Sequence, residues 1–158
     1  MNTLIIFSAK YLYLVAVLFA VVLWWRLKEQ RKDIAVLGII SLPLMYLVSR
    51  LAGYLYFNPR PFVVGHFVPL ISHSVDNGFP SDHTLLLSAL AMLFFYYRRS
   101  ASVLLWGFAF IVGAARVMAG VHHWLDIAGS MVIAFCVAWA CYTYLLPLVK
   151  RTKFYQRM

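Results

Sequence analysis

Long apolar runs dominate this sequence and set the strongest limit on its fold. Five stretches of the 158-residue chain are almost entirely apolar and about as long as a membrane-spanning helix: 4–25, 34–57, 81–97, 101–121 and 124–149. A helix needs about 20 apolar residues to cross the hydrocarbon core of a bilayer. Because lipid offers backbone polar groups no water, each crossing segment has to satisfy its own hydrogen bonds as a helix. The sequence therefore predicts an all-α transmembrane bundle of about five, or six, helices in a single domain over residues 1–158.

The composition supports a membrane protein and excludes other classes. Hydrophobic residues make up 64% of the chain, charged residues 12%, and the mean hydropathy is +0.82, whereas soluble domains are roughly 45–50% apolar and about 25% charged. These values exclude a soluble enzyme, a disordered chain and a disulfide-rich secreted scaffold. The net charge of +9 is typical of cytoplasmic loops that face anionic headgroups. We therefore expect membrane lipids, and no nucleic acid, as partners.

The basic residues predict how the chain is oriented. Ten of the fourteen Lys and Arg residues lie in segments 26–32, 98–99 and 150–157, which five spans place on one side of the membrane. The positive-inside rule makes that side cytoplasmic, with the N-terminus outside and the C-terminus inside. The first apolar run has its basic residues behind it and no small-residue cleavage site, which indicates an uncleaved anchor.

Three polar clusters interrupt the apolar sequence, each at the outward end of a predicted helix. They are residues 58–61 (Asn-Pro-Arg-Pro), residues 80–83 (Pro-Ser-Asp-His), and the set Arg116, His122 and Asp126. The predicted topology brings all three to one face of the membrane. Ionisable groups are costly at such depths, so these clusters predict a functional site.

The residue types in these clusters suit the binding of a phosphate group. Arg60 and Arg116 each offer a planar fork of donors that pairs with phosphate oxygens and stays charged. Ser81 stands where a helix N-cap is expected. The free amides of Asp82 and His83 then lie at the positive end of a helix dipole, which favours an anion.

The third cluster predicts a nucleophile. His122 and Asp126 are four residues apart, so a carboxylate can hold the imidazole in one tautomer and leave the other ring nitrogen free to attack phosphorus. His83 is a candidate general acid for the leaving oxygen. The same histidine and aspartate, with His123, could instead bind a metal, but two neighbouring arginines would repel a cation. The sequence assigns no role to His123.

Each cluster also has an ordinary structural interpretation. Arg60 could anchor a helix at the headgroups, Ser81 could be a helix cap alone, and His83 could be an interfacial histidine. The loop 58–80 is too apolar for a solvated loop of its length, which indicates a partly inserted interfacial segment. We expect His66 and His73 in this loop to have no catalytic part.

Taken in order, the three clusters resemble the signature of the type 2 phosphatidic acid phosphatase superfamily, whose blocks are Lys-x6-Arg-Pro, Pro-Ser-Gly-His and Ser-Arg-x5-His-x3-Asp. The resemblance covers about half of the chain, from residue 50 to residue 126. It implies a metal-independent phosphatase without a cofactor that works through a phosphohistidine. By position, His122 matches the nucleophile, Asp126 its orienting partner and His83 the acid, while the phosphate ligands match Arg60, Ser81 and Arg116.

This chain departs from the family pattern at three positions. Gly53 stands where the family has its lysine, and Arg50, three residues earlier, is a candidate replacement. Asp82 stands where many members have glycine, and in this respect the block resembles the bacitracin-resistance type of undecaprenyl-diphosphate phosphatase. Ala115 replaces the serine before Arg116, which removes at most one hydroxyl donor.

The resemblance implies a lipid substrate. We expect hydrolysis of undecaprenyl diphosphate to undecaprenyl phosphate and inorganic phosphate in a bacterial inner membrane, with the site facing the periplasm or cell exterior. Phosphatases for phosphatidylglycerophosphate, phosphatidate or a lipid A phosphate are alternatives, and so is a lipid-phosphate transporter without catalysis. The sequence does not set an oligomeric state.

Overall fold

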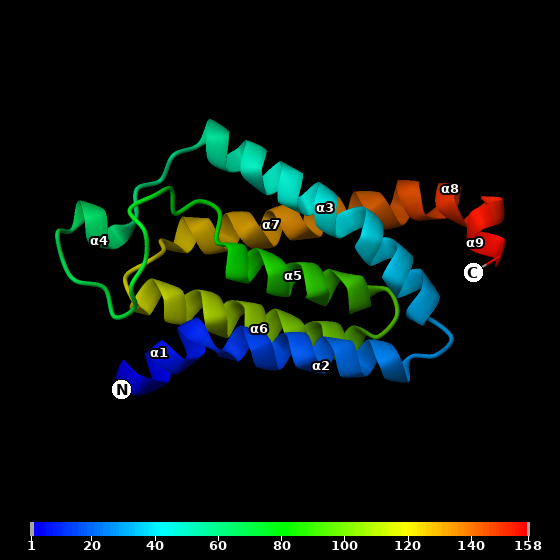
Figure 1. Ribbon diagram of the computed structural model, residues 1–158, viewed down its shortest axis with the longest axis horizontal. Coiled ribbons are helices and arrows are strands. Elements are labelled where there is room, and N and C mark those ends of the chain that lie inside the picture. Colours follow the sequence, from blue (N-terminus) through cyan, green and yellow to red (C-terminus); the bar gives the residue numbers. More distant parts are fainter. Residues whose placement is uncertain (1, 158) are drawn as a thin grey trace.

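The computed structural model describes residues 2–157 and confirms the predicted all-α fold (Figure 1). Within these residues the only strand-like pairing is one isolated bridge between Pro59 and Asn77. The helices are α1 Asn2–Lys10, α2 Leu12–Arg26, α3 Arg31–Leu55, α4 Pro61–Val64, α5 Asp82–Phe95, α6 Arg99–Met118, α7 Trp124–Ala140, the π-helical turn η1 Cys141–Leu145, α8 Leu146–Lys150 and α9 Lys153–Arg157.

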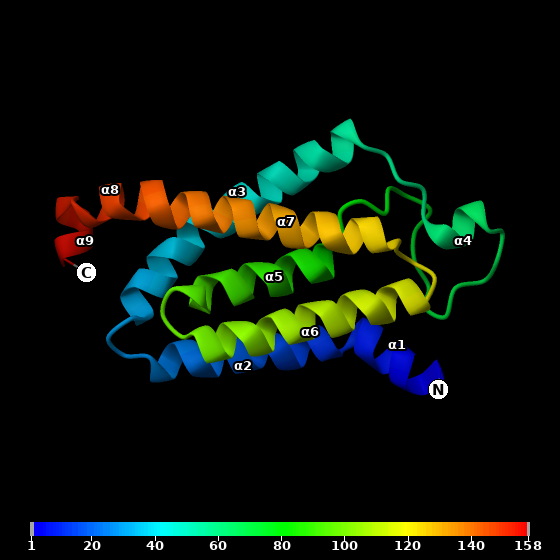
Figure 2. The same cartoon turned by 180° about the vertical axis from the view of Figure 1, so that it is seen from behind.

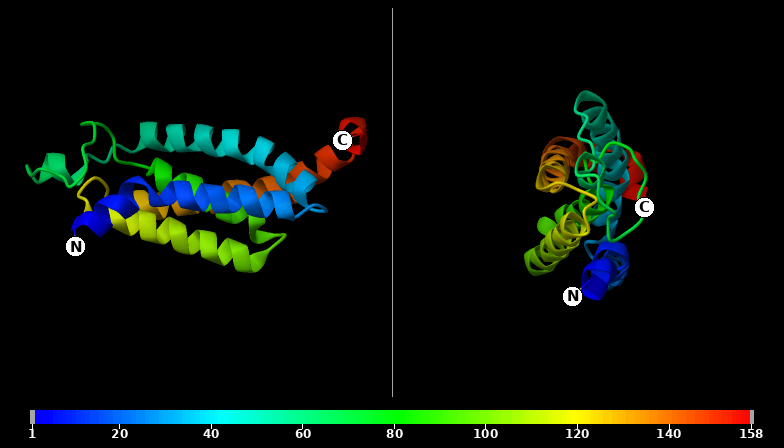
Figure 3. Two further views of the ribbon diagram at one scale, coloured as in Figure 1. Left: turned by 60° about the horizontal axis from the view of Figure 1, so that its bottom comes forward. Right: turned by 90° about the vertical axis from the view of Figure 1, so that its left-hand side faces the viewer.

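The chain runs back and forth between two ends of an elongated bundle (Figures 1 and 3). The N-terminus, the long loop with α4 and the α6–α7 connection lie at one end. The C-terminus and the α2–α3 and α5–α6 connections lie at the other. Below, the first is called the site end.

The predicted number of membrane spans is matched only roughly. Among the described residues, three continuous helices are long and apolar enough to cross a membrane: Arg31–Leu55, Arg99–Met118 and Trp124–Lys150. The run 4–25, predicted as one helix, is instead α1 and α2, which meet at Tyr11 with a bend of 44° and give a fourth span if counted together. Helix α5, with 14 residues, is shorter than a usual span.

The shortness of α5 shapes the site end. At 1.5 Å per residue, α5 is about 21 Å long and the 25-residue α3 is about 38 Å long. Nine of the fourteen residues of α5 are buried, and the helix lies between α6 and α7, with its N-terminus set back from the end of the bundle (Figures 1 and 2). The first turn of α5 therefore lies deeper in the bundle than the adjacent ends of α6 and α7.

The long apolar loop is only partly buried. Ile71 is 4% exposed and packs near Ala115 of α6 and Ala119 just after it, and the amide of Leu70 donates to the Ala119 carbonyl at 3.0 Å. Val68, by contrast, is 91% exposed. The loop is therefore anchored to the bundle near residue 71, while its apolar tip points outward, as an interfacial segment would.

Close packing of α6 on α7 depends on a glycine. A methyl group at Gly113 would lie 2.6 Å from Ile127 Cγ2, and Ile127 is only 2% exposed. A β-branched side chain has little rotamer freedom in a helix, so Ile127 cannot easily move away. Gly107, in the same helix, has no neighbour within 4 Å of the corresponding position.

We predict that Gly113→Ala lowers the free energy of unfolding by about 1–3 kcal/mol because it overpacks the α6–α7 contact. Gly107→Ala, the matched control, should leave stability unchanged or raise it by up to about 1 kcal/mol, since alanine favours helix. Thermal unfolding of both purified variants in detergent measures the difference. Equal stability of the two variants would contradict the packing argument.

Candidate active site

A polar cavity of about 410 Å³ opens at the site end, above the start of α5. Its walls come from the end of α3, the long loop, the first turn of α5, the last turn of α6 and the α6–α7 connection. Six of the residues that the sequence singled out line it: Arg50, Arg60, Asp82, His83, Arg116 and His122. Residues far apart in the chain are thus brought to one place.

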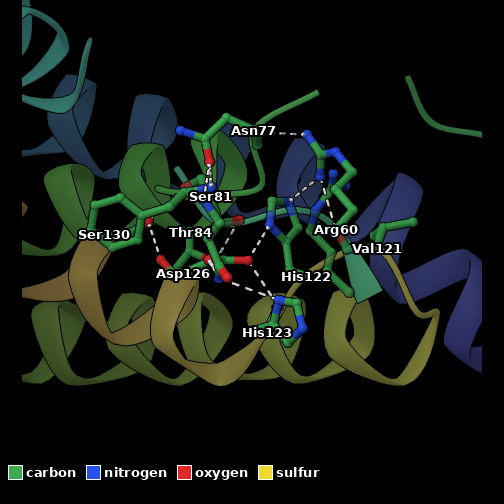
Figure 4. Close-up of polar contacts among 12 residues, drawn as sticks. Arg60, Asn77, Ser81, Thr84, Val121, His122, His123, Asp126 and Ser130 are labelled. Carbon is green, nitrogen blue, oxygen red and sulfur yellow. Dashed lines mark hydrogen bonds and ion pairs between the residues drawn. The ribbon is translucent and has the colours of Figure 1, made fainter. Parts of the chain in front are cut away.

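His122 and Asp126 form a buried pair at the base of this cavity (Figure 4). The His122 ring is 3% exposed, and its Nδ1 lies 3.2 Å from Asp126 Oδ2. Because a carboxylate accepts hydrogen bonds, Nδ1 carries the proton and Nε2 keeps a free electron pair. Nε2 lies 3.4 Å from Arg60 Nη1. The geometry therefore suits a neutral imidazole with its nucleophilic nitrogen turned toward a guanidinium.

The surroundings favour the neutral form of His122. Burial lowers the pKa of His122 below its ordinary value, and the positive charges of Arg116 and Arg60 lower it further. The hydrogen bond to Asp126 opposes this effect without overcoming it. The ring thus keeps its free electron pair to lower pH than an exposed histidine would.

Asp126 is fully buried, and its carboxylate is satisfied by three donors. Oδ1 accepts from Asn58 Nδ2 at 2.7 Å, and Oδ2 accepts from the His123 amide at 2.8 Å as well as from His122. A buried carboxylate without such partners would be strongly unfavourable. The His123 ring lies beside Asn58, with 3.3 Å between His123 Nδ1 and Asn58 Nδ2, so this histidine borders the pair from outside.

Arg60 directly precedes α4 and is 5% exposed. Its Nε donates to Asp76 Oδ1 at 2.6 Å, its Nη1 to the Val121 carbonyl at 2.8 Å, and its Nη2 to the Asn77 carbonyl at 3.4 Å. These contacts, some of which Figure 4 shows, hold the guanidinium beside the His122 ring.

Arg116 belongs to the last turn of α6 and is 4% exposed. Its Nη1 donates to the Ala9 carbonyl of α1 at 3.2 Å, and its Nη2 lies 3.1 Å from His73 Nε2. Its Nε is buried and has no hydrogen-bond partner among the residues that the structure describes. Two buried guanidinium groups beside one imidazole make this cavity suited to an anion.

Arg50 reaches the same cavity from α3. Its Nη2 lies 3.4 Å from Asp82 Oδ1, and both side chains are more than half exposed. At Gly53, where the family has lysine, an added methyl group would lie 2.9 Å from the Phe79 carbonyl oxygen, and Asn77 Nδ2 donates to the Gly53 carbonyl at 2.7 Å. The loop thus packs directly on residue 53, and Arg50, about one turn earlier, supplies the positive charge at this wall.

Ser81 stands at the predicted N-cap position of α5, but its hydroxyl makes no side-chain cap and accepts from Thr84 Oγ1 at 3.2 Å. The residue is fully buried, and its carbonyl accepts from Ser130 Oγ at 2.9 Å (Figure 4). Ser81 therefore fixes the start of α5 against α7 and lies behind the cavity wall.

His83 lines the same cavity as His122. It belongs to the first turn of α5 and lines the cavity, and its ring meets the edge of the Tyr13 ring of α2 with 4.6 Å between centroids. The bent N-terminal helix pair therefore contacts two of the predicted site residues, Arg116 through Ala9 and His83 through Tyr13.

The structure also adds residues that the sequence interpretation missed. The long loop contributes His73, Asp76 and Asn77 to the cavity wall, and of these the sequence considered only His73, which it expected to have no catalytic part. One signal could have identified Asp76: acidic residues are rare, with five in the whole sequence. Asp76, Asp82 and Asp126 are the three on the predicted outward side, and all three lie in or beside the site. No spacing in the sequence indicates His73 or Asn77.

A buried histidine–aspartate pair facing two buried arginines is an arrangement that suits phosphoryl transfer. The chain belongs to the PAP2 superfamily, whose pattern matches residues 46–150. This matched region includes each site residue that the sequence predicted, and the family resemblance of the sequence is thereby confirmed.

Three named relatives share this region. "Bacitracin transport permease protein BcrC" of Bacillus licheniformis is 30% identical over 134 residues, which cover 84% of this chain and 66% of that protein. YbjG of Escherichia coli (strain K12), provisionally named an undecaprenyl-diphosphatase, is 37% identical over 83% of this chain and 67% of that protein. "Undecaprenyl-diphosphatase BcrC" of Bacillus subtilis (strain 168) is 29% identical over 87% and 71%. The chain spans about two thirds of the length of these relatives.

We predict that inorganic phosphate stabilises the protein, because it occupies the cavity between the two guanidinium groups. At a concentration 100 times its Kd, a ligand adds about 2.7 kcal/mol to the free energy of unfolding, which raises Tm by about 5–10 °C for a chain of this size. Arg116→Gln should abolish most of this shift. Thermal unfolding in detergent with phosphate, against chloride at equal ionic strength, measures it. An equal shift in both proteins would contradict the assignment of Arg116.

Proposed function

We propose that this chain is a membrane lipid phosphatase that hydrolyses undecaprenyl diphosphate to undecaprenyl phosphate and inorganic phosphate. The family and the names of two relatives support a phosphatase of a polyprenyl diphosphate. The observation that carries the proposal is the buried His122–Asp126 pair with Nε2 turned toward Arg60.

In the first step the electron pair of His122 Nε2 forms a bond to the terminal phosphorus. The bond between that phosphorus and the bridging oxygen breaks, and its electron pair leaves with the oxygen, which takes a proton from His83. The products are undecaprenyl phosphate and a phosphohistidine. Asp126 accepts the Nδ1 hydrogen bond and stabilises the positive charge that develops on the ring.

In the second step water attacks the same phosphorus. The bond from phosphorus to Nε2 breaks, its electron pair returns to His122, and inorganic phosphate leaves. The proton of the attacking water passes to His83, which restores the acid for the next cycle. The reaction needs no metal and no cofactor in this scheme.

The positive groups of the cavity hold the phosphoryl oxygens. Arg60 and Arg116 neutralise the charge of the transferred group, and the amides of Asp82 and His83 at the start of α5 add donors. Ser81 contributes by fixing this helix start. Arg50, tied to the exposed Asp82 carboxylate, binds the phosphate that stays on the lipid.

The membrane setting follows from the charge pattern. We infer a multi-pass protein of the bacterial inner membrane, with a single domain over residues 1–158. Its site faces the periplasm or cell exterior, as does its N-terminus, and its C-terminus is cytoplasmic. The site and the N-terminus share one end of the bundle (Figure 1), and the basic segments 26–32, 98–99 and 150–157 share the other, which supports this orientation.

Two alternatives predict different behaviour. A phosphatase for phosphatidylglycerophosphate, phosphatidate or a lipid A phosphate would use the same site and differ in the preferred lipid. A lipid-phosphate transporter would need the arginines, but it would need neither His122 with a free electron pair nor its buried aspartate.

We predict that the purified protein releases phosphate fastest from undecaprenyl diphosphate in a panel of these lipids. Activity should persist in EDTA and be blocked by vanadate.

His122→Ala should lower kcat by at least about 10³-fold, because it removes the nucleophile. Asp126→Asn should lower kcat by about 10²- to 10⁴-fold, because the tautomer of His122 is no longer held. Hydrolysis retained in His122→Ala would refute the mechanism, and faster turnover of phosphatidate would refute the substrate.

We predict a separate effect for Arg50→Gln. The loss of this guanidinium should lower kcat/KM for undecaprenyl diphosphate by about tenfold, the scale of one charge-assisted hydrogen bond. Hydrolysis of phosphatidate, which has a single phosphate, should change less. Arg99→Gln, at the opposite end of the bundle, is the control for a lost positive charge. Equal losses with both lipids would argue against contact with a second phosphate.

A further inference from the structure

A chain of hydrogen bonds in the long loop joins the two buried arginines. It begins where Arg116 Nη2 meets His73 Nε2 at 3.1 Å. His73 Nδ1 lies 3.4 Å from Ser74 Oγ, and Ser74 Oγ donates to Asp76 Oδ2 at 2.7 Å. The other oxygen of Asp76 accepts from Arg60 Nε at 2.6 Å. Three residues of one loop thus span the distance between the guanidinium groups.

Side-chain chemistry determines which group donates and which accepts in each of these hydrogen bonds. A guanidinium only donates, so His73 Nε2 accepts from Arg116 and carries no proton. Ser74 has one hydroxyl proton and gives it to Asp76, so it can only accept from His73, whose Nδ1 therefore carries the ring proton. This series of hydrogen bonds therefore requires a neutral His73 with its proton on Nδ1.

At one end of this series of hydrogen bonds, the guanidinium of Arg116 is fixed in position. Arg116 is held at Nη1 by the Ala9 carbonyl and at Nη2 by His73, and these two acceptors fix the plane of the group. Its buried Nε has no partner among the described residues. The His73 ring lies close to the His122 ring, with 6.1 Å between centroids and planes at 77°.

We propose that His73 is a positioning residue: through its contact with Arg116 and the Ser74–Asp76 relay to Arg60, it aligns both guanidinium groups for the phosphoryl group at His122. This inference rests on the proposed function and adds a loop residue outside the three signature blocks. His73 acts through Arg116 and does not itself attack or protonate the substrate.

Protonation of His73 would break this arrangement. A proton on Nε2 would face the N–H of Arg116 and add a third positive charge to the cavity. The charged or titratable groups around His73 are Arg60 before α4, Arg116 of α6, His122 after α6, His83 of α5, and Asp76 of its own loop. Burial lowers the pKa of His73, as do Arg60, Arg116 and His122, while Asp76 opposes them. The neutral form is therefore the working one.

The test compares two substitutions at His73. His73→Phe keeps an aromatic ring but removes the acceptor, whereas His73→Gln keeps an acceptor that can meet Arg116 and cannot be protonated. With undecaprenyl diphosphate we expect His73→Phe to lower kcat by about 10- to 100-fold, the scale of a misplaced catalytic group. His73→Gln should recover most of this loss. His66→Asn removes an imidazole at an exposed site in the same loop and suits the positive φ of 50° there. It is the control and should keep wild-type kcat.

The pH profile gives a second readout that a merely structural role would not change. Below neutrality, wild-type kcat/KM should fall with loss of the neutral forms of both His122 and His73, and in His73→Gln with loss of His122 alone. The slope of log kcat/KM against pH should therefore be lower by about one in His73→Gln, because the ionisations of His83 and of the substrate are common to both proteins.

The outcomes are distinct. If wild-type protein releases phosphate and His122→Ala does not, the proposed function holds, and the His73 variants then decide the inference alone. Wild-type kcat in His73→Phe, no recovery in His73→Gln, or identical pH slopes would each overturn it. If His73→Phe fails to fold in a thermal unfolding measurement, the pH slope of His73→Gln decides.

Discussion

A fully buried carboxylate is the constraint on which the site end of this protein depends. Asp126 has no contact with solvent, so three donors from two separate segments must converge on it: the Asn58 side-chain amide after α3, and the His122 ring and His123 backbone amide before α7. An unpartnered charge at this depth would be strongly unfavourable. Satisfying it draws the long loop against the start of α7, and the same convergence orients the ring that the proposed chemistry uses.

Helix lengths then decide where the chemistry can take place. Because α5 is much shorter than α3 and α6, its first turn lies inside the bundle, and longer neighbours surround it. The first turn of α5 therefore lines one cavity together with Arg60 and Arg116. The π-helical turn Cys141–Leu145 lies toward the opposite end of the bundle from the site. At that end Lys150 and Tyr155 both donate hydrogen bonds to the Asp33 carboxylate.

The sequence predicted the fold class and the convergence of the motif residues, because apolar runs set helices and an antiparallel path brings alternate helix ends together. It did not predict the break at Tyr11, since no proline or glycine interrupts that run. Asn77 bonds the carbonyls of Gly53 and Tyr56, and His73 meets Arg116, across 20 to 45 residues of chain. Such contacts arise from tertiary folding of a loop and leave no periodic trace in the sequence. Ser81 shows the reverse case: it lies at the predicted N-cap position of α5, but its hydroxyl contacts Thr84 and makes no cap.

The contacts of the bent N-terminal pair have a consequence for how the protein can be divided. Helix α1 lies outside the region 46–150 that matches the superfamily, yet its Ala9 carbonyl orients Arg116, and Tyr13 of α2 packs on His83. The pair is thus a structural part of the site end and not a detachable membrane tether. Replacing α1 and α2 by the corresponding segment of a relative would therefore also replace the groups that contact Arg116 and His83.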